Sequence, residues 1–326
     1  MISTPTDDGC YLVTGALGCI GAWMTRLLLQ SGARVVALDA GTDDHRLKAA
    51  LLDTSEARLE RVVGDVTDLA QITEIITEHQ VDAIIHLAAL QVPSCQANPV
   101  LGAQVNVVGQ MVMLEAARSL SSGRPLVYAS SVGAYAPSGG KQGLADPPAT
   151  FYGVYKRAGE QAAALYAKSF GVASIGIRPH TVYGPGRDFG VSAQPTFAVL
   201  AAAEGRPYHM PYGGDVQLQF VEDVAQSFVN ASRSDYDGSC VVDLVGHSVT
   251  MSDVVDAITA AVPQSQGTIT FDDVQLPFPT GLGTGESPFP RAADRSIADG
   301  MRATVAHAQR LHREALTGSG PLKGSS

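Results

Sequence analysis

The chain has 326 residues, of which 45% are hydrophobic and 17% charged, so it is long and apolar enough to bury a sizeable core. The formal net charge of −10 argues against a nucleic-acid partner, because affinity for a phosphate backbone depends mainly on Lys and Arg. Apolar runs such as residues 197–203 fall short of the roughly 18 residues that a membrane helix needs. Acidic Asp7 and Asp8 stand where a secretory signal would be basic, so we expect a cytoplasmic protein that acts on small molecules.

Short apolar runs rich in Val and Ile alternate with longer segments of helical spacing, which is typical of strand-helix-strand units in a parallel sheet. The predicted strands are Tyr11–Thr14, Arg34–Leu38, Leu59–Val63, Ala83–His86, Pro125–Ala129 and Ser174–Ile177. The predicted helices between them are Ile20–Gln30, Leu69–Glu78, Val105–Ser119 and Tyr152–Ser169. Six such strands predict an α/β fold with a doubly wound, Rossmann-type parallel sheet.

The chain becomes rich in turns after Pro179, and we expect a smaller substrate-binding domain there. A further buried strand at Val241–Leu244 indicates that the chain returns to the large sheet, and a helix at Met251–Ala261 then belongs to the smaller domain. The expected division is a Rossmann domain of residues 1–178, with a returning segment at about 217–245, and an interleaved substrate domain of residues 179–216 and 246–316. The Gly/Ser-rich residues 317–326 and the first eight or so residues are expected to be disordered.

A glycine-rich loop connects the first predicted strand to the first helix. From Thr14 to Gly21 it has G-x-x-G-x-x-G spacing, and glycine lets the backbone approach a pyrophosphate at a helix N-terminus. Asp39 follows the second strand at close to the roughly 20-residue spacing of a ribose-binding acid, where a carboxylate also repels a 2′-phosphate. The sequence therefore predicts an NAD site, and the exclusion of NADP is weakened by the nearby cations His45, Arg46 and Lys48.

A tyrosine and a lysine lie four residues apart in a predicted helix. Tyr152 and Lys156 therefore share one face of that helix. A free tyrosine has a pKa near ~10, so a nearby ammonium and the positive nicotinamide are needed to stabilise its phenolate. Ser130 and Ser131 follow the fifth strand, where a hydroxyl can hydrogen-bond the reacting oxygen. Such pairs also occur on the surface of amphipathic helices, and the position of this one, in the strand-helix unit that follows Ser130 and Ser131, favours a catalytic role.

The order of these motifs resembles the extended short-chain dehydrogenase/reductases, or NAD-dependent epimerase/dehydratases. The resemblance covers about the first two-thirds of the chain, and beyond the segments above it includes Gly64-Asp65-Val66, His86–Ala89, Asn106, Val127–Ser131, Arg178-Pro179, Val182–Arg187 and Phe220–Ala225. It implies that Ser131, Tyr152 and Lys156 are catalytic, with Tyr152 removing a hydroxyl proton while hydride passes to the nicotinamide. It also implies cofactor contacts at Gly15, Leu17, Gly18, Cys19, Ile20, Gly21, Asp39, Asp65, Val66, Leu87, Ala88, Ala89, Asn106, Tyr152, Lys156, Pro179 and Val182.

The sequence departs from the family pattern in the substrate region. Relatives that act on nucleotide sugars carry a diphosphate-binding Arg seven positions before the aspartate that matches Asp223, and here that position is Val216. We do not expect Arg291 to replace it. The departure favours a smaller substrate such as a sugar, a sugar acid or a related hydroxy compound, with candidate contacts at Gln91, Ser131, Tyr152, His180, Arg187, Gln217 and Gln219.

The leading hypothesis is an NAD-dependent dehydrogenase or epimerase that acts at a secondary alcohol carbon. One alternative is a nucleotide-sugar 4-epimerase or dehydratase, and an alternative of another class is a non-catalytic NAD(H)-sensing regulator. The resemblance also implies a homodimer, formed by the helices Val105–Ser119 and Tyr152–Ser169 as a four-helix bundle. The four cysteines form no C-x-x-C pair, so we expect free thiols and no metal site.

Overall fold

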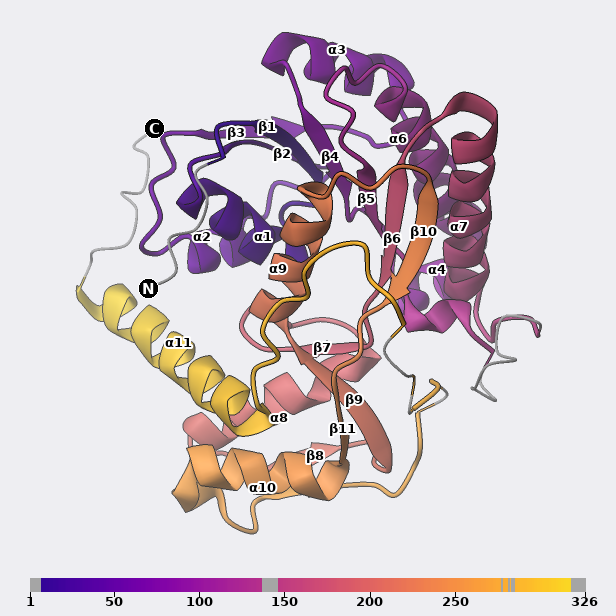
Figure 1. Ribbon diagram of the computed structural model, residues 1–326. Helices are drawn as coiled ribbons and strands as arrows, with labels where there is room; N and C mark the ends of the chain where they lie inside the picture. The colour runs from indigo at the N-terminus through magenta and orange to yellow at the C-terminus, as the bar shows by residue number, and fades with distance from the viewer. Residues whose placement is uncertain (1–6, 137–145, 277, 281, 283–284, 318–326) are drawn as a thin grey trace.

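The computed structural model describes residues 7–136, 146–276, 278–280, 282 and 285–317. Its largest element is a seven-stranded sheet with the strand order β10-β6-β5-β4-β1-β2-β3, in which every neighbouring pair is parallel (Figure 1). The doubly wound α/β fold predicted from the sequence is thereby confirmed. The strands are β1 (Cys10–Thr14), β2 (Arg34–Asp39), β3 (Leu59–Val63), β4 (Ala83–His86), β5 (Leu126–Ala129), β6 (Ser174–Arg178) and β10 (Ser239–Asp243).

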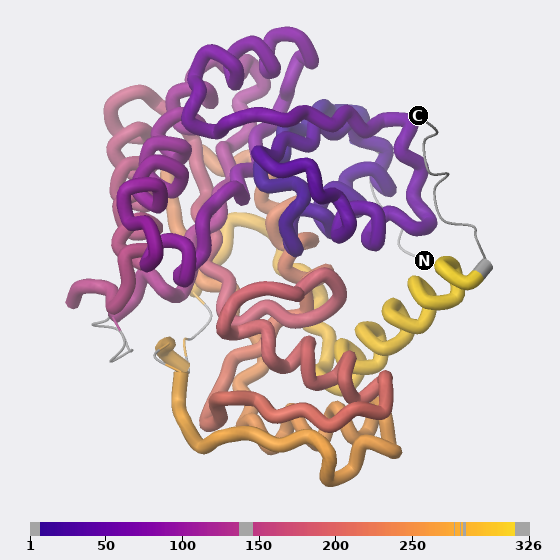
Figure 2. The backbone as a smooth tube through the Cα atoms, turned by 180° about the vertical axis from the view of Figure 1, so that it is seen from behind, coloured from indigo at the N-terminus to yellow at the C-terminus, as the bar shows by residue number. Residues whose placement is uncertain are grey.

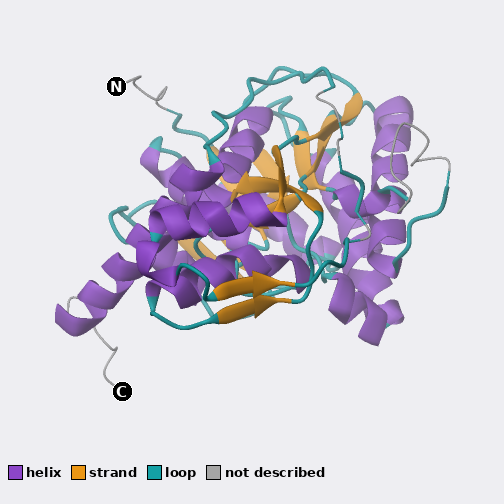
Figure 3. Ribbon diagram, turned by 90° about the horizontal axis from the view of Figure 1, so that it is seen from below, coloured by secondary structure: helices purple, strands orange, loops and turns teal. Residues whose placement is uncertain are grey.

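Helices cover both faces of the large sheet (Figure 3). One face carries α1 (Cys19–Gln30), α2 (His45–Ala50) and α9 (Val221–Ser232), and the other carries α3 (Leu69–His79), α6 (Gly109–Ala117) and α7 (Phe151–Phe170). Successive residues of a strand point to opposite faces, so Tyr11 packs into the first core and Leu12 into the second. Because both faces are covered, inner strands such as β1 and β4 are buried and mainly apolar, whereas the edge strand β3 carries the exposed Glu60 and Arg61.

The segment before α6 is helical from Pro99. It consists of α5 (Pro99–Ala103) and a π-helical turn, η1 (Gln104–Val108), and the short helix α4 (Val92–Ala97) precedes it. By length and composition alone, the stretch Pro99–Ala117 could cross a membrane. In the structure this stretch packs against α3 and α7. A helix in the core of a protein can have the same length and apolar composition as a membrane-spanning helix.

A smaller body is built from two further sheets. Its three-stranded sheet has the order β11-β9-β7, and its two-stranded sheet pairs β12 with β8. The strands are β7 (Thr181–Tyr183), β8 (Tyr208–Met210), β9 (Asp215–Phe220), β11 (His247–Thr250) and β12 (Ile269–Phe271). The helices are α8 (Gln194–Ala203), α10 (Met251–Ala261) and α11 (Ile297–Thr317), with 3₁₀ turns at η3 (Val191–Ala193) and η4 (Pro263–Ser265).

The chain passes between the two bodies more than once (Figure 2). After β9 it returns to the large sheet as α9, which packs against α1, and as β10, which pairs with β6. The predicted returning segment began at about residue 217, but β9 belongs to the smaller sheet, so the return begins at Val221. The strand that carries Gln217 and Gln219 is therefore part of the smaller body.

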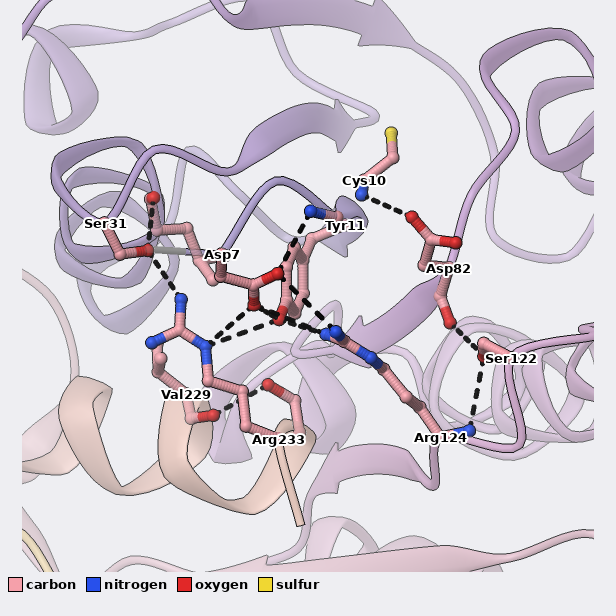
Figure 4. Close-up of polar contacts among 12 residues, drawn as sticks. Asp7, Cys10, Tyr11, Ser31, Asp82, Ser122, Arg124, Val229 and Arg233 are labelled. Carbon is pink, nitrogen blue, oxygen red and sulfur yellow. Dashed lines mark hydrogen bonds and ion pairs between the residues drawn. The ribbon is translucent and has the colours of Figure 1, made fainter. Parts of the chain in front are cut away.

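An ion cluster lies at the amino end of β1 (Figure 4). The Asp7 carboxylate accepts a hydrogen bond from Arg233 Nε at 3.0 Å, forms an ion pair with Arg124 Nη1 at 3.4 Å, and hydrogen-bonds to the Tyr11 hydroxyl. Both guanidinium groups lie over the Tyr11 ring, at 5.3 and 6.0 Å from its centroid. Asp7 is thus held in place, contrary to the predicted disorder of the first eight residues, whereas residues 1–6 and 318–326 lie outside the described residues.

Asp7→Asn is expected to lower the free energy of unfolding at pH 7 by about 1–2 kcal/mol, because charge-assisted hydrogen bonds are lost. Burial opposes ionisation of Asp7, but hydrogen bonds from Tyr11, Gly9 and Arg124 outweigh it and lower the pKa to about 2. The carboxylate therefore stabilises the fold fully above its unfolded pKa, and this contribution fades as the pH falls toward 2. Urea unfolding at pH 7 and pH 3 checks this, because the difference in the free energy of unfolding between wild type and variant should be smaller at pH 3 than at pH 7. An equal gap at both pH values contradicts the expectation.

Candidate active site

A cavity of about 730 Å³ lies at the carboxyl ends of the strands of the large sheet. Loops that follow β1, β2, β3, β4, β5 and β6 all contribute to its wall, and the smaller body closes it with residues such as Arg187, Ser192 and Phe278. Loops at the carboxyl ends of parallel strands meet at one edge of a sheet, which is where open α/β sheets bind their ligands. This volume is within the range of ordinary ligand sites.

The glycine-rich loop forms one end of the cavity. Gly15 has a φ of +68°, and a Cβ there would lie 2.7 Å from the backbone nitrogen of Ala88; a Cβ on Gly21 would overlap the Gly15 carbonyl. Helix α1 begins at Cys19 after Gly18, which provides no side-chain cap, and no acidic residue lies in the first turn. The amides at this helix N-terminus therefore suit an anion such as a pyrophosphate.

Asp39, at the end of β2, lies beside this loop. Its carboxylate accepts hydrogen bonds from Leu17 N at 3.0 Å and Gly41 N at 3.1 Å, which fixes it in the cavity wall. A carboxylate retains lone pairs that can accept the hydroxyls of a ribose. Together with the glycine loop, it makes the cavity fit NAD. Besides Asp39, the predicted cofactor residues that line the cavity are Gly15, Leu17, Gly18, Cys19, Ile20, Gly21, Asp65, Val66, Leu87, Ala88, Ala89, Tyr152, Lys156, Pro179 and Val182.

Asn106 does not line the cavity, so the prediction of a direct cofactor contact is corrected. Its side-chain oxygen accepts a hydrogen bond from Leu90 N at 2.7 Å, and its amide donates to Leu90 O at 2.9 Å. Asn106 is buried in the π-helical turn and uses its amide to hold the loop that follows β4.

The predicted catalytic residues come together where α7 meets the turn after β5. A Cβ on Gly153 would overlap the Gly133 carbonyl, so the first turn of α7 lies directly against η2 (Val132–Ala134). This contact brings Tyr152 next to Ser131, and both line the cavity together with Lys156. The helix starts at this point because the Thr150 hydroxyl caps it by accepting a hydrogen bond from Gly153 N at 3.1 Å.

Burial and nearby charges shift the pKa values of Lys156 and Tyr152. Lys156 is buried, donates from Nζ to the carbonyl of Ala129 at 2.6 Å, and lies 5.5 Å from the centroid of the Tyr152 ring. Burial lowers the pKa of Lys156 to about 8. Burial raises the pKa of Tyr152, while a hydrogen bond from Ser131 and the charge of Arg187 act to lower it. Sequence reasoning assigned this effect to Lys156 and the nicotinamide, and the structure adds Arg187.

Arg187 is the main charged group in the substrate half of the cavity. Its Nη2 donates to Ser192 Oγ at 3.1 Å, and its buried Nε has no partner among the described residues. Gln91 and His180 also line this half, as predicted. Burial lowers the pKa of His180, which as the neutral imidazole donates from Nε2 to the carbonyl of Pro279 at 2.7 Å. The rest of this half is apolar and includes Val92, Val191, Leu276 and Phe278.

Gln217 and Gln219 do not line the cavity, so the structure does not bring these two predicted substrate contacts to the site. Gln219 accepts a hydrogen bond from His180 N at 2.8 Å and donates to Leu244 O at 2.6 Å. The Gln217 amide donates to Ser248 Oγ at 3.0 Å. Both side chains are buried in the smaller body, where they tie β9 to its neighbours.

The position of the diphosphate-binding Arg of nucleotide-sugar relatives is apolar in the structure as well. Val216 is buried in the core of the smaller body. Arg291 donates to the carbonyl of Gly285 at 2.7 Å and does not line the cavity. Among the described residues that line the cavity, the guanidinium groups are those of Arg46 and Arg187.

Behind the catalytic residues lies a buried ionic network that sequence reasoning did not find. Arg178 donates from Nε and Nη2 to the Glu160 carboxylate at 2.7 and 2.6 Å, and Ser130 hydrogen-bonds to the same carboxylate. The Tyr135 hydroxyl accepts from Arg178 at 2.9 Å and donates to Asp243 at 2.8 Å. Glu160 is one helical turn after Lys156, which is the sequence signal that could have indicated it.

The model of the NAD-dependent epimerase/dehydratase family matches residues 11–241 of this chain. Two similar relatives are the UDP-glucose 4-epimerase of Mycolicibacterium smegmatis, 34% identical over 233 residues, and the UDP-glucuronate 4-epimerase 4 of Arabidopsis thaliana, 31% identical over 195 residues. The first alignment covers 68% of this chain and 72% of the bacterial protein. The second covers 56% of this chain and 44% of the plant protein, so the chain matches less than half of that relative's length.

Solved structures share the fold over nearly the whole chain. The UDP-N-acetylglucosamine 4-epimerase of Methanobrevibacter ruminantium, in complex with UDP-N-acetylmuramic acid, has a TM-score of 0.80 at 19% identity and covers 94% of this chain and 99% of that one. The dTDP-glucose 4,6-dehydratase of Bacillus anthracis, in complex with NAD, has a TM-score of 0.77 at 19% identity, with 94% and 98% covered. At 19% sequence identity, the similarity to these two structures shows that the fold is shared.

Proposed function

Because the chain belongs to the NAD-dependent epimerase/dehydratase family, we propose that it transfers hydride at a secondary alcohol carbon of a sugar, a sugar acid or a related hydroxy compound. One observation carries the proposal. Ser131, Tyr152 and Lys156 lie together in the wall of a cavity whose other end is the glycine-rich loop with Asp39. An acid-base group and a dinucleotide site in one cavity are what hydride transfer at an alcohol requires.

The residues of the chain supply the proton chemistry of this reaction. When NAD is bound, its nicotinamide supplies the hydride acceptor. The Ser131 hydroxyl orients the substrate oxygen, and Tyr152 takes the hydroxyl proton as the carbon is oxidised. The charge of Arg187 favours the phenolate that this step needs, and the Lys156 ammonium lies 5.5 Å from the centroid of the Tyr152 ring. A dehydrogenase releases the ketone, whereas an epimerase would retain it until hydride is returned to its opposite face and Tyr152 gives the proton back to the oxygen.

Arg187→Gln is expected to raise the pKa of Tyr152, because the Arg187 charge is one of the influences that lower it. Alcohol oxidation needs Tyr152 as a base. The rising limb of the plot of kcat/KM against pH should therefore shift to higher pH, by about one pH unit. Arg187→Lys keeps the charge and should leave the limb near its wild-type position. If the limb is unmoved in Arg187→Gln, the guanidinium does not act on Tyr152.

A second candidate function is that of a nucleotide-sugar 4-epimerase or dehydratase. It is favoured by the two relatives described above, whose names specify UDP-sugars. Against it stands the apolar Val216 at the position of the diphosphate-binding Arg. The purified protein with NAD is therefore incubated with UDP- and dTDP-hexoses and, in parallel, with free aldoses and aldonates. NADH absorbance detects a dehydrogenase, and chromatography of the sugars detects an epimerase. Turnover of nucleotide sugars alone would replace the first candidate with the second.

The same proposal includes a cytoplasmic homodimer. Apolar side chains are exposed along the helical segment before α6 and on α7, which lie side by side: Val100 at 70%, Val108 at 46%, Val154 at 46% and Leu165 at 61%. Such a face is typical of an interface between helices. The cysteines are all free, which suits a reducing compartment. Light scattering of the purified protein and fractionation of cells test the two parts, and a monomer or a secreted protein would refute them.

A further inference from the structure

A loop of the smaller body lies against the cofactor half of the cavity. This loop, residues 184–190, follows β7, and its glycines at 184, 186 and 190 all have positive φ. The indole of Trp23 in α1 donates to the carbonyl of Pro185 at 2.9 Å. A Cβ on Gly186 would lie 4.0 Å from both Cys19 Sγ and Arg46 Cβ. The loop is therefore packed against the start of α1 and against α2.

One carboxylate of this loop engages two cationic side chains of α2. Asp188 Oδ1 accepts a hydrogen bond from Arg46 Nε at 2.8 Å and lies 2.6 Å from Arg46 Nη2. Asp188 Oδ2 lies 2.8 Å from His45 Nε2, and the other ring nitrogen of His45 lies 2.8 Å from Asp43. The cations that sequence analysis identified as weakening the exclusion of NADP are thus all paired with carboxylates, since Lys48 pairs with Asp44 at 2.9 Å.

Arg46 is placed where an adenosine 2′-phosphate would come. It lines the cavity together with Asp39, Gly41 and Asp43. Its Nη1 lies 3.5 Å from the carbonyl of Leu17, the residue whose N–H holds the Asp39 carboxylate. A guanidinium that is free beside the ribose-binding acid is the group that accommodates a 2′-phosphate.

We propose that Asp188 is a selectivity determinant that keeps the site specific for NAD by engaging Arg46 and His45 from the loop packed against α2. Asp43 and Asp188 pair with these two cationic side chains, and Asp39 lines the same cavity as Arg46, so the region disfavours additional negative charge. Removing Asp188 frees the guanidinium and makes the region less negative, and both changes favour a 2′-phosphate. This role of Asp188 depends on the dinucleotide site and is independent of the substrate that the enzyme converts.

The test measures binding to the cofactor-free protein by calorimetry. Wild type and Asp188→Asn are titrated with NAD and NADP, and with AMP and adenosine 2′,5′-bisphosphate as probes that lack the nicotinamide. In Asp188→Asn the ratio of the NADP Kd to the NAD Kd is expected to fall by about tenfold. The bisphosphate is expected to gain affinity relative to AMP by a similar factor. Asp188→Ser should reproduce both changes, so the result does not depend on one substitution.

Two controls make the outcome specific. Asp272→Asn removes the same charge from an exposed carboxylate-histidine pair with His209, outside the cavity, and should leave the ratio unchanged. The double variant Asp188→Asn/Arg46→Gln should return the ratio to the wild-type value, because the freed guanidinium is gone. An unchanged ratio in Asp188→Asn, or a shift that persists in the double variant, overturns the proposal. If wild type binds neither dinucleotide, the cofactor site itself is wrong, which is a distinct result.

Discussion

Tyr152→Phe is expected to lower kcat about 10³-fold, since a positioned acid-base group contributes about 10²–10⁴-fold to proton transfer. The phenyl ring keeps the shape of the wall next to Ser131 and Lys156 but cannot accept the substrate proton. Affinity for NAD should stay within about threefold, because the glycine loop and Asp39 are untouched. Steady-state kinetics and calorimetry with NAD measure the two quantities separately.

The matched control is Tyr155→Phe, three residues later in the same helix. The Tyr155 hydroxyl donates to the carbonyl of Pro99 at 2.8 Å and does not line the cavity. Its loss should cost about 1 kcal/mol of stability and leave kcat unchanged. Equal activity of Tyr152→Phe and wild type would refute the catalytic assignment, whichever substrate is used.

Glu160→Ala is expected to lower the free energy of unfolding by about 3–5 kcal/mol, because removing one partner of a buried ion pair leaves the other charge uncompensated. Side chains of Glu160 and Arg178 are 8% and 6% exposed. Burial disfavours the charge of Arg178, but the hydrogen bonds and the charge of Glu160 outweigh this and raise its pKa. The residual contact of Arg178 with Asp243, at 3.4 Å, places the expected loss toward the lower end of the range.

Urea unfolding of Glu160→Ala is compared with that of Glu204→Ala. Glu204 also pairs with an arginine, Arg206, but the two side chains are 59% and 60% exposed. Exposed pairs contribute at most about 1 kcal/mol, so this control should differ little from wild type. If the two variants lose the same stability, the network behind the active site does not hold the fold in the way its burial implies.

The strands of the large sheet were predictable because both of its faces are covered. A strand buried on both sides is a short run of apolar residues between turns, so β4 has the predicted bounds and β1 and β5 differ by one residue. The edge strand β3 also has the predicted bounds, although its Glu60 and Arg61 are exposed. The helix predicted over Val105–Ser119 begins in the structure at Pro99, through a π-helical turn. Such a turn has no periodicity of its own and leaves no signature in the sequence.

The catalytic and cofactor residues were predictable where chemistry depends on local spacing, as it does for the glycine loop and for Tyr152 with Lys156. Two of the predicted substrate contacts do not line the cavity. Gln217 and Gln219 are polar residues on β9, but that strand is buried from Val216 to Phe220, and alternation does not tell a ligand-facing side chain from one that binds backbone. Asp188 meets Arg46 across 142 positions of sequence, and no local pattern indicates such a pair.

The path of the chain between the two bodies limits how the enzyme can be re-engineered. The chain leaves the large sheet after β6, comes back as α9 and β10, and leaves again before β11. A truncation at residue 178 would expose the hydrogen-bonding edge of β6 and uncover the apolar side of α1, inviting aggregation. A foreign recognition module therefore has to be spliced in at all three crossings, since fusion to the end of the Rossmann half would leave that half unfinished.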